Sequence, residues 1–166
     1  RPIYQIEGIL NHVKKSATYK FALFRALSEL ATQNPNSVTW LTDGKVRLPV
    51  RFVCEKWLQY YWPLLESEKF IPQLNGEQQG SGKPIKFRIN LTLLIAQYRA
   101  LGGYSAFRID RNKGTLSAAN QKLLKSVIAD IEHAIVRGPV VYSGGALITG
   151  RVFDFDTKTK QIIIPK

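Results

Sequence analysis

Two segments of this sequence combine cationic side chains with small or hydrogen-bonding residues, which is the chemistry that binds phosphate. The first is 14–20, where lysines flank hydroxyl-bearing and small residues at the start of an apolar helical pattern. Free backbone N–H groups and the positive end of the helix dipole attract anions at such a start. The candidate phosphate-binding residues in this segment are Lys14, Lys15, Ser16, Thr18, Tyr19 and Lys20.

Two cations of the helix that follows are expected to differ in role. Lys20 precedes Leu27 by seven residues, so its side chain points nearly along the apolar stripe of the helix. It should emerge at the rim of the core with its aliphatic stem packed. Arg25 points to the opposite side, and we expect it to be exposed and to contribute little to binding.

The second segment, 78–88, is rich in amides, glycines and basic residues. Amides can read base edges, cations can neutralise phosphates, and glycines let the backbone approach a groove. The polar stretch 73–83 predicts a mobile loop inside one domain, because apolar periodicity resumes directly after it. The same composition is also typical of a dispensable insertion. The candidate contacts here are Gln78, Gln79, Ser81, Lys83, Pro84, Lys86 and Arg88.

Side chains that could perform catalysis are few and scattered. His12 and His133 lie in separate predicted helices, without a cysteine or carboxylate at metal-ligand spacing. Asp154 and Asp156 resemble a Mg²⁺ pair, but alternation along a strand puts both carboxylates on the solvent face. We therefore expect a binding domain that is not an enzyme by itself, with no catalytic residue, no metal site and no cofactor.

A mainly helical domain must position these segments. Alternating residues at 152–156 and β-branched residues at 161–164 predict a C-terminal hairpin, and 37–41 is expected to be extended before a turn at 43–44. The expected fold class is mainly α, a single-domain helical bundle with a small C-terminal β-hairpin over 1–166. Apolar residues at helical spacing predict five helices. The second begins at Ser16 or Thr18 and ends at a break at 34–36, and the others lie at 3–13, 49–65, 91–101 and 117–135.

The amino-acid composition indicates which class of molecule the chain binds. Lys and Arg number 24 against 12 Asp and Glu, a net charge of +12, and such an excess in a folded domain usually indicates nucleic acid. The single cysteine, Cys54, excludes an internal disulfide and a Cys-based zinc site, and it favours a reducing, cytoplasmic setting. No apolar run approaches the roughly 20 residues of a membrane span, so no membrane partner is expected.

Four short motifs resemble the modules that precede HNH nuclease domains in bacterial restriction proteins. They are TYKFALFRAL at 18–27, YYWPLL at 60–65, the glycine pair at 102–103 and IIIP at 162–165. In that family the last motif leads into the HNH segment. The resemblance and the initial Arg1 together imply a domain excised from a larger HNH endonuclease.

Within this family the chain resembles the sulfur-binding domains, which recognise phosphorothioate-modified DNA through a shallow apolar pocket built around a proline ring and bordered by cations. Tyr19-Lys20 is similar to the family's His-Arg/Lys pair, with Tyr in place of His. The aromatic-proline element matches 83–85, or alternatively 70–72, and Arg108 matches a later arginine. The resemblance implies a module that reads phosphorothioated duplex DNA and targets a fused nuclease in bacterial modification-dependent restriction.

Three other functions remain open at this point. The chain could read another DNA modification, a plain DNA sequence or structured RNA, in which case its affinity would depend on salt but not on sulfur. It could be a metal-dependent nuclease that uses Asp154, Asp156 and a histidine, which cleavage of plasmid with Mg²⁺ or Mn²⁺ would reveal. It could also bind a protein, and polyanions would then not compete.

Overall fold

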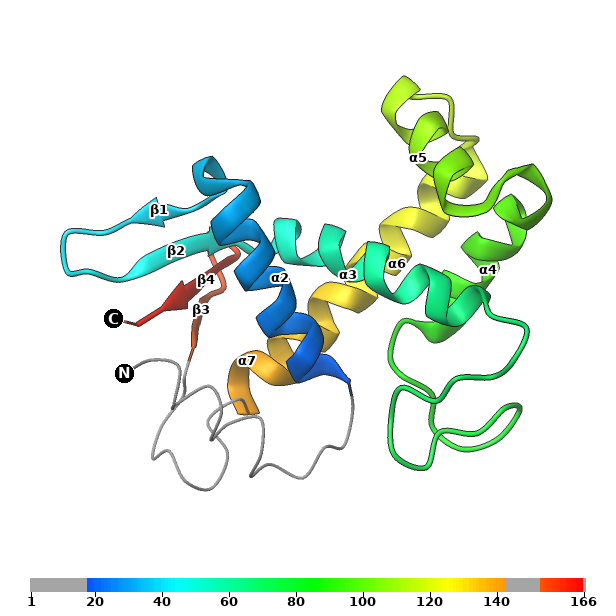
Figure 1. Ribbon diagram of the computed structural model, residues 1–166, viewed down its shortest axis with the longest axis horizontal. Coiled ribbons are helices and arrows are strands. Elements are labelled where there is room, and N and C mark those ends of the chain that lie inside the picture. The colour runs from blue at the N-terminus through cyan, green and yellow to red at the C-terminus, as the bar shows by residue number, and fades with distance from the viewer. Residues whose placement is uncertain (1–17, 143–152, 166) are drawn as a thin grey trace.

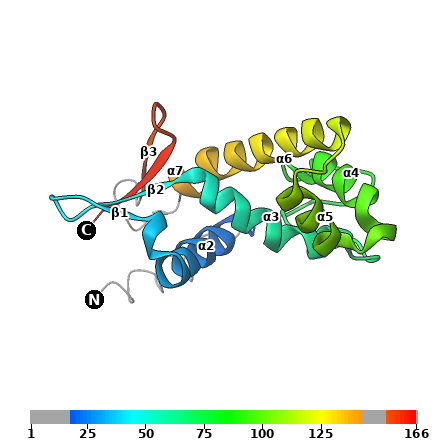
Figure 2. The same ribbon diagram turned by 90° about the horizontal axis from the view of Figure 1, so that it is seen from above.

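Three helices form the body of the fold in the computed structural model, which describes residues 18–142 and 153–165 (Figure 1). They are α2 (Tyr19–Gln33), α3 (Val50–Glu66) and α6 (Ala118–Arg137). Figure 2 shows α3 lying between the other two, and it packs against both. Because α3 is covered on two sides, nine of its residues are buried, among them Trp57, Tyr61 and Trp62. The core between these helices includes Leu23, Ala26, Val53, Leu58, Val127 and Ile131.

The helix boundaries follow the predicted signals closely. The Ser117 hydroxyl accepts the backbone N–H of Asn120 and so caps α6, as predicted. Pro49 is the residue before α3, one position earlier than the first helical position expected for it. The α6 helix ends at Gly138 and is followed by the short α7 (Pro139–Tyr142). The helix predicted at 3–13 lies outside the described residues.

A second group of helices occupies one end of the body (Figure 1). It consists of α4 (Arg88–Tyr98), the 3₁₀ turn η2 (Arg99–Leu101) and α5 (Gly103–Lys113). The predicted stop at the glycine pair is confirmed, since Gly102 has a φ of +112° that favours glycine. The α5 helix begins at the very next residue and was not predicted, because Phe107 is its one buried residue.

A four-stranded antiparallel sheet lies at the other end of the body (Figure 1). The predicted C-terminal hairpin is confirmed as β3 (Asp154–Asp156) and β4 (Gln161–Ile164). Two further strands, β1 (Thr39–Trp40) and β2 (Val46–Pro49), extend it in the order β1-β2-β4-β3. The register pairs Leu48 with Ile162, both buried, so the sheet joins the core. The fold is therefore mainly α, with a sheet larger than the predicted hairpin alone.

Candidate functional site

The loop between α3 and α4 is organised around a buried carboxylate, Glu77. Its side chain is 1% exposed, and its oxygens accept the backbone N–H groups of Gln73 and Ile85 at 2.6 and 2.9 Å. Arg88 donates to both oxygens, at 2.6 and 3.0 Å, and also to the carbonyl of Ile71 at 2.8 Å. Burial opposes ionisation of Glu77, but Arg88 and the two N–H groups outweigh it and hold its pKa below the ordinary value.

The ion pair between Glu77 and Arg88 makes the loop an integral part of the domain. Removing Glu77 would leave the buried Arg88 guanidinium, whose side chain is 14% exposed, without its counter-charge. The loop is therefore built into the domain, and the alternative of a dispensable insertion is wrong. Arg88 also stacks over the ring of Phe70, 4.5 Å from its centroid. Arg88 therefore fixes the loop, and its contact with phosphate stays a prediction.

The loop is anchored to the start of α2 by Tyr19. The Tyr19 ring lies 5.2 Å from that of Trp57 and 6.0 Å from that of Phe87, measured between centroids. Its phenolic oxygen accepts the backbone N–H of Lys86 at 3.3 Å. Burial raises the pKa of Tyr19, so this hydroxyl stays protonated at neutral pH. The first residue of α2 therefore holds the segment that follows Pro84.

Thr18 makes a second link between the two predicted segments. Its hydroxyl does not cap α2 as expected; it donates to the side-chain oxygen of Gln73 at 3.0 Å and contacts the Tyr61 hydroxyl at 2.8 Å. Its backbone N–H donates to the carbonyl of Gln73 at 3.0 Å. Because the side chain and the backbone of Thr18 bind the same residue, the entry to α2 and the loop form one surface.

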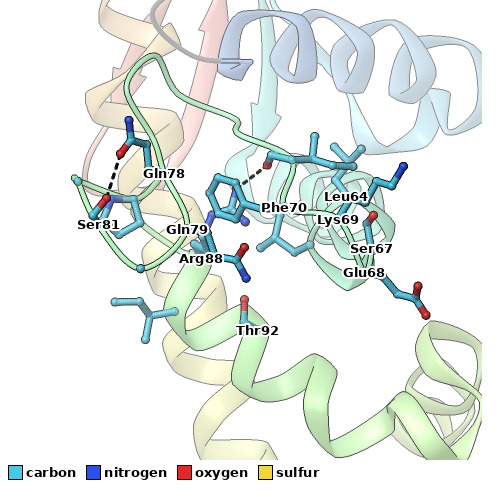
Figure 3. A pocket seen from close by; sticks show the side chains of 16 residues that line it. Leu64, Ser67, Glu68, Lys69, Phe70, Gln78, Gln79, Ser81, Arg88 and Thr92 are labelled. Atoms are coloured by element: carbon cyan, nitrogen blue, oxygen red, sulfur yellow. Dashed lines mark hydrogen bonds between the residues drawn. The ribbon is translucent and has the colours of Figure 1, made fainter.

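A pocket of about 410 Å³ opens between the end of α3, this loop and the first turns of α4 (Figure 3). Five of the candidate contacts line it, namely Gln78, Gln79, Ser81, Pro84 and Arg88. Its apolar side includes Leu64, Phe70, Ile71, Pro84 and Ile89. Both sequence matches to the aromatic-proline element thus contribute to one pocket, because Phe70 and Ile71 come from one match and Pro84 from the other. Pro72 is not among the lining residues.

Residues 78–82 form a tight loop tip, which supplies the polar rim of this pocket. The Ser81 hydroxyl donates to the Gln78 side-chain oxygen at 3.0 Å, as the dashed line in Figure 3 shows. Gly80 and Gly82 have φ of +73° and +74°, which side chains other than glycine rarely adopt. A Cβ at Gly82 would lie 2.9 Å from the carbonyl oxygen of Gly76, so this tip requires glycine there.

A smaller hollow of about 180 Å³ adjoins the pocket at the start of α2. Leu64 lines both cavities, so they are neighbours. Thr18 lines the small one, and Arg25 stands at its side with its guanidinium 4.0 Å from the centroid of the Tyr60 ring. Figure 1 shows the start of α2 and the loop on the same side of the molecule.

The predicted cations differ in their surroundings. Lys20 is half-buried, and burial lowers its pKa, in agreement with a position at the rim of the core. Arg25 is exposed as expected, and its charge is matched by Glu29 at 2.9 Å. Lys83 and Lys86 are exposed, and the ammonium of Lys86 lies 3.9 Å from a carboxylate oxygen of Asp130.

One predicted residue lies away from this site, and three others cannot be placed in it. Arg108 is on α5 and lines a different cavity, of about 490 Å³, where a bidentate pair between Arg111 and Glu55 also lies. Its place in the pocket border, implied by the resemblance, is therefore not supported by the geometry. Lys14, Lys15 and Ser16 lie outside the described residues.

Three residues that build the site were not identified from the sequence. In the sequence Glu77 is one acid in a polar loop, eleven residues before Arg88. A single acid among amides and glycines is the signal that could have indicated its buried ion pair with Arg88. The Phe87 ring contacts both Tyr19 and Tyr61, with 4.9 Å between the Phe87 and Tyr61 centroids, and no local pattern could reveal these contacts.

Within the described ranges, no group of three or more His, Cys, Asp or Glu side chains could hold a metal ion. Asp154 is exposed, and Asp156 accepts the backbone N–H groups of Lys158 and Thr159 in the β3–β4 turn. Over the same part of the chain, no helix is both long and apolar enough to cross a membrane.

Comparison with known proteins gives a family without a described activity. A search of curated proteins finds no match, and a search of solved structures finds none either. One family model covers residues 1–164, almost the whole chain, and is described as a domain of unknown function. The chain therefore belongs to the family DUF8808.

Proposed function

We propose that the chain is a DNA-binding recognition module that reads phosphorothioate-modified duplex DNA. The observation that carries the proposal is the pocket in which the Pro84 ring, Phe70 and Ile71 lie beside the hydrogen-bonding groups of the loop tip. Ile85, the residue after Pro84, is 1% exposed and fixes the proline from inside the domain. An apolar cavity of this kind favours a weakly hydrated atom over a strongly hydrated one.

The chemistry of the modification matches such a cavity. Replacing one non-bridging phosphate oxygen by sulfur makes that face of the group softer and less hydrated. Sulfur can enter an apolar pocket without losing strong hydrogen bonds to water, whereas an oxygen there would be left without its partners. The neighbouring amides of Gln78 and Gln79 then face the groove, where base edges are read.

Affinity for the phosphate backbone would come from cations around the pocket. Lys69 lines it, Lys83 is exposed at its loop, and Lys20 lies on the adjoining start of α2. Arg88 adds no net charge to this surface because Glu77 neutralises it. We place the module in the cytoplasm of a bacterium, attached to an HNH nuclease that it directs to modified DNA. The mobility of the loop without DNA stays a prediction.

The proposal is tested by fluorescence anisotropy on one duplex with and without a stereodefined phosphorothioate, at several salt concentrations. Both affinities should fall in parallel on a log–log plot as salt rises, since cations lose strength to counterions. Burial of one weakly hydrated atom should add about 1–3 kcal/mol that salt barely changes. The ratio of affinities should therefore stay at roughly ten to a hundred throughout.

Pro84→Ala should shrink this ratio, and Pro72→Ala is the matched control because Pro72 is exposed and outside the pocket lining. A ratio near one at every salt concentration would leave a generic basic DNA-binding domain. Equal losses in the two proline variants would move the sulfur contact away from this pocket. Incubation with plasmid and Mg²⁺ or Mn²⁺ should give no cleavage, and metal-dependent cutting lost in Asp154→Ala would favour a nuclease instead.

A further inference from the structure

The cavity of about 490 Å³ that Arg108 lines lies between α3, α5 and the end of α2. It shares no lining residue with the pocket of about 410 Å³ or with the hollow of about 180 Å³. Figure 1 shows α5 and the end of α2 on one side of the body and the loop between α3 and α4 on the other. Cavities of this volume hold small molecules in other proteins. It is therefore a candidate site separate from the one proposed to bind DNA.

Two ion pairs fix the walls of this cavity. Arg111 on α5 donates to both carboxylate oxygens of Glu55 on α3, at 2.6 and 2.7 Å. Lys56, the next residue of α3, lies 3.0 Å from a carboxylate oxygen of Glu29 on α2. A bidentate pair between arginine and a carboxylate holds both side chains in one geometry. The three helices are thus tied together around the cavity, so its shape is formed without a ligand.

Other side chains of the lining have hydrogen-bonding groups that the fold does not use. Arg108 is exposed, and no carboxylate of the described residues pairs with it. Burial raises the pKa of Tyr104, so its hydroxyl keeps its proton and can donate. Three amides of the lining make no side-chain hydrogen bond within the same part of the chain: Asn34, Gln59 and Asn112. Polar groups that converge on a preformed cavity in this way indicate a ligand.

We propose that this cavity binds a free nucleotide, with the phosphate at Arg108 and the base beside Phe52 and Tyr104. Charge selects an anion. Of the described residues that line the cavity, one is an acid, Glu55, and three are cations, namely Lys56, Arg108 and Arg111. The guanidinium of Arg108, which no acid neutralises, offers the planar fork of N–H donors that matches phosphate.

The rest of the lining distinguishes a nucleotide from other anions. The edge of a nucleobase presents both donors and acceptors, and the amides of Asn and Gln also have both. The faces of a base pack on aromatic rings, which the half-buried Phe52 and Tyr104 provide here. A sugar phosphate has no flat aromatic face, and a dicarboxylate has no donor for the amide oxygens. A nucleotide therefore matches the cation, the amides and the rings together.

A nucleotide of DNA has the same chemistry as a free one, and the place of the cavity separates the two sources. The cavity is on the side of the body away from the loop that we propose to contact DNA (Figure 1). A duplex bound at that loop would not present a base to the cavity, which favours a free nucleotide. Nucleotide binding does not depend on the proposed DNA-binding function, and it is tested first without DNA.

The test is isothermal titration calorimetry of the full chain with AMP, GMP, CMP and UMP, with their nucleosides and with ribose 5-phosphate. At least one nucleotide should bind about ten times more tightly than its nucleoside and than ribose 5-phosphate, because each fragment leaves polar groups of the cavity unpaired. Arg108→Gln should weaken binding of that nucleotide about tenfold or more, since a charge-assisted contact is lost. Lys113→Gln is the matched control and should change little: it removes the same charge from an exposed position of α5 outside the cavity lining.

Several results would overturn the proposal. Failure of all four nucleotides to bind at millimolar concentration would remove it, and equal affinity for a nucleotide and ribose 5-phosphate would mean that the cavity takes any phosphate. Equal losses in Arg108→Gln and Lys113→Gln would mean that net charge alone attracts the nucleotide. Repeating the titration with excess duplex should leave the affinity unchanged, and competition would mean that the cavity takes a nucleotide of the DNA instead. Nucleotide binding by a chain without preference for phosphorothioate would support this inference while the proposed function fails.

Discussion

Tyr19 and Lys86 lie 67 positions apart in the sequence, and the phenolic oxygen of Tyr19 accepts the backbone N–H of Lys86 at 3.3 Å. Through this bond the start of α2 sets the position of the chain just after Pro84. The Tyr19 ring packs on Phe87 as well, so it holds the same segment by two contacts. Tyr19 is therefore a positioning residue for the pocket and lies outside the pocket lining itself.

Tyr19→Phe keeps the ring contacts and removes the acceptor. The loss of one hydrogen bond should cost about 1 kcal/mol. The affinity ratio between modified and unmodified DNA should shrink, because Pro84 is less firmly placed. Tyr104→Phe is the control: its ring packs similarly on Trp62 and Phe107 at the far end of the domain. Thermal unfolding and anisotropy measure both effects, and an unchanged ratio in Tyr19→Phe would separate Tyr19 from recognition.

Glu77→Gln should be the most destabilising of these substitutions. It preserves the shape of the side chain but leaves the guanidinium of Arg88 buried without a counter-charge, which costs about 3 kcal/mol or more. Glu68→Gln changes an exposed acid of the same pocket and should cost little. Urea unfolding at neutral pH measures both variants, and similar midpoints would contradict the structural role of Glu77.

The same carboxylate should make stability sensitive to acid. Because the pKa of Glu77 is lower in the folded state, the unfolded chain binds more protons in the acid range. Its contribution is complete above the unfolded value of about 4.3 and is lost as the pH falls through the folded pKa. Glu77→Gln should therefore lose less stability than the wild type on acidification below about pH 4.3, as urea unfolding at a series of pH values can show. Parallel pH profiles would argue against this assignment.

Two neighbouring glycines provide a matched pair for testing the loop tip. Gly80→Ala meets an unfavourable φ but no nearby atom, so it should cost about 1–2 kcal/mol. Gly82→Ala meets a similar φ and also places its Cβ against the Gly76 carbonyl, so it should cost more and weaken DNA binding further. Thermal unfolding and anisotropy of the two variants should rank them in this order. The reverse order would mean that the tip adopts another conformation.

Lys20→Ala should weaken DNA binding more than Arg25→Ala, although each removes one positive charge. Lys20 lies in the first turn of α2, next to Tyr19, which contacts the loop, whereas Arg25 lies more than one turn further along the helix. Lys20→Ala should lower the slope of log affinity against log salt by about 0.9, the value of one phosphate contact. Arg25→Ala should leave this slope nearly unchanged. Equal slopes would mean that net charge alone governs binding.

The sequence predicted elements whose signal is local and missed those that depend on distant partners. The α6 helix has its apolar stripe within its own residues and its cap and terminal glycine directly beside them, and it was located to within a few positions. The α5 helix buries Phe107 alone and starts at a glycine, so too few apolar residues mark it in the sequence. The pairing of β2 with β4 joins segments that are far apart in the chain, and nothing local to 46–49 indicates it.

The candidate site shows the same division. The residues that line the pocket were found by their chemical type, because glycines, amides and a proline beside cations are visible in the sequence. The role of Arg88 in fixing the loop was not visible, because its partner Glu77 lies eleven residues away across the loop. Only the folded structure shows which cations already pair with an acid of the same chain.

The position of β4 in the sheet has a consequence for how the domain forms. Val46 pairs with Ile164, so the two central strands come from segments that are far apart in the chain. Contacts between such distant segments close slowly, which makes the sheet a late step in folding. Until β4 arrives, β2 presents an inner edge of unpaired backbone groups beside apolar side chains, a template for pairing with another chain. A strand that completes the native sheet thus also protects the newly made chain from aggregation.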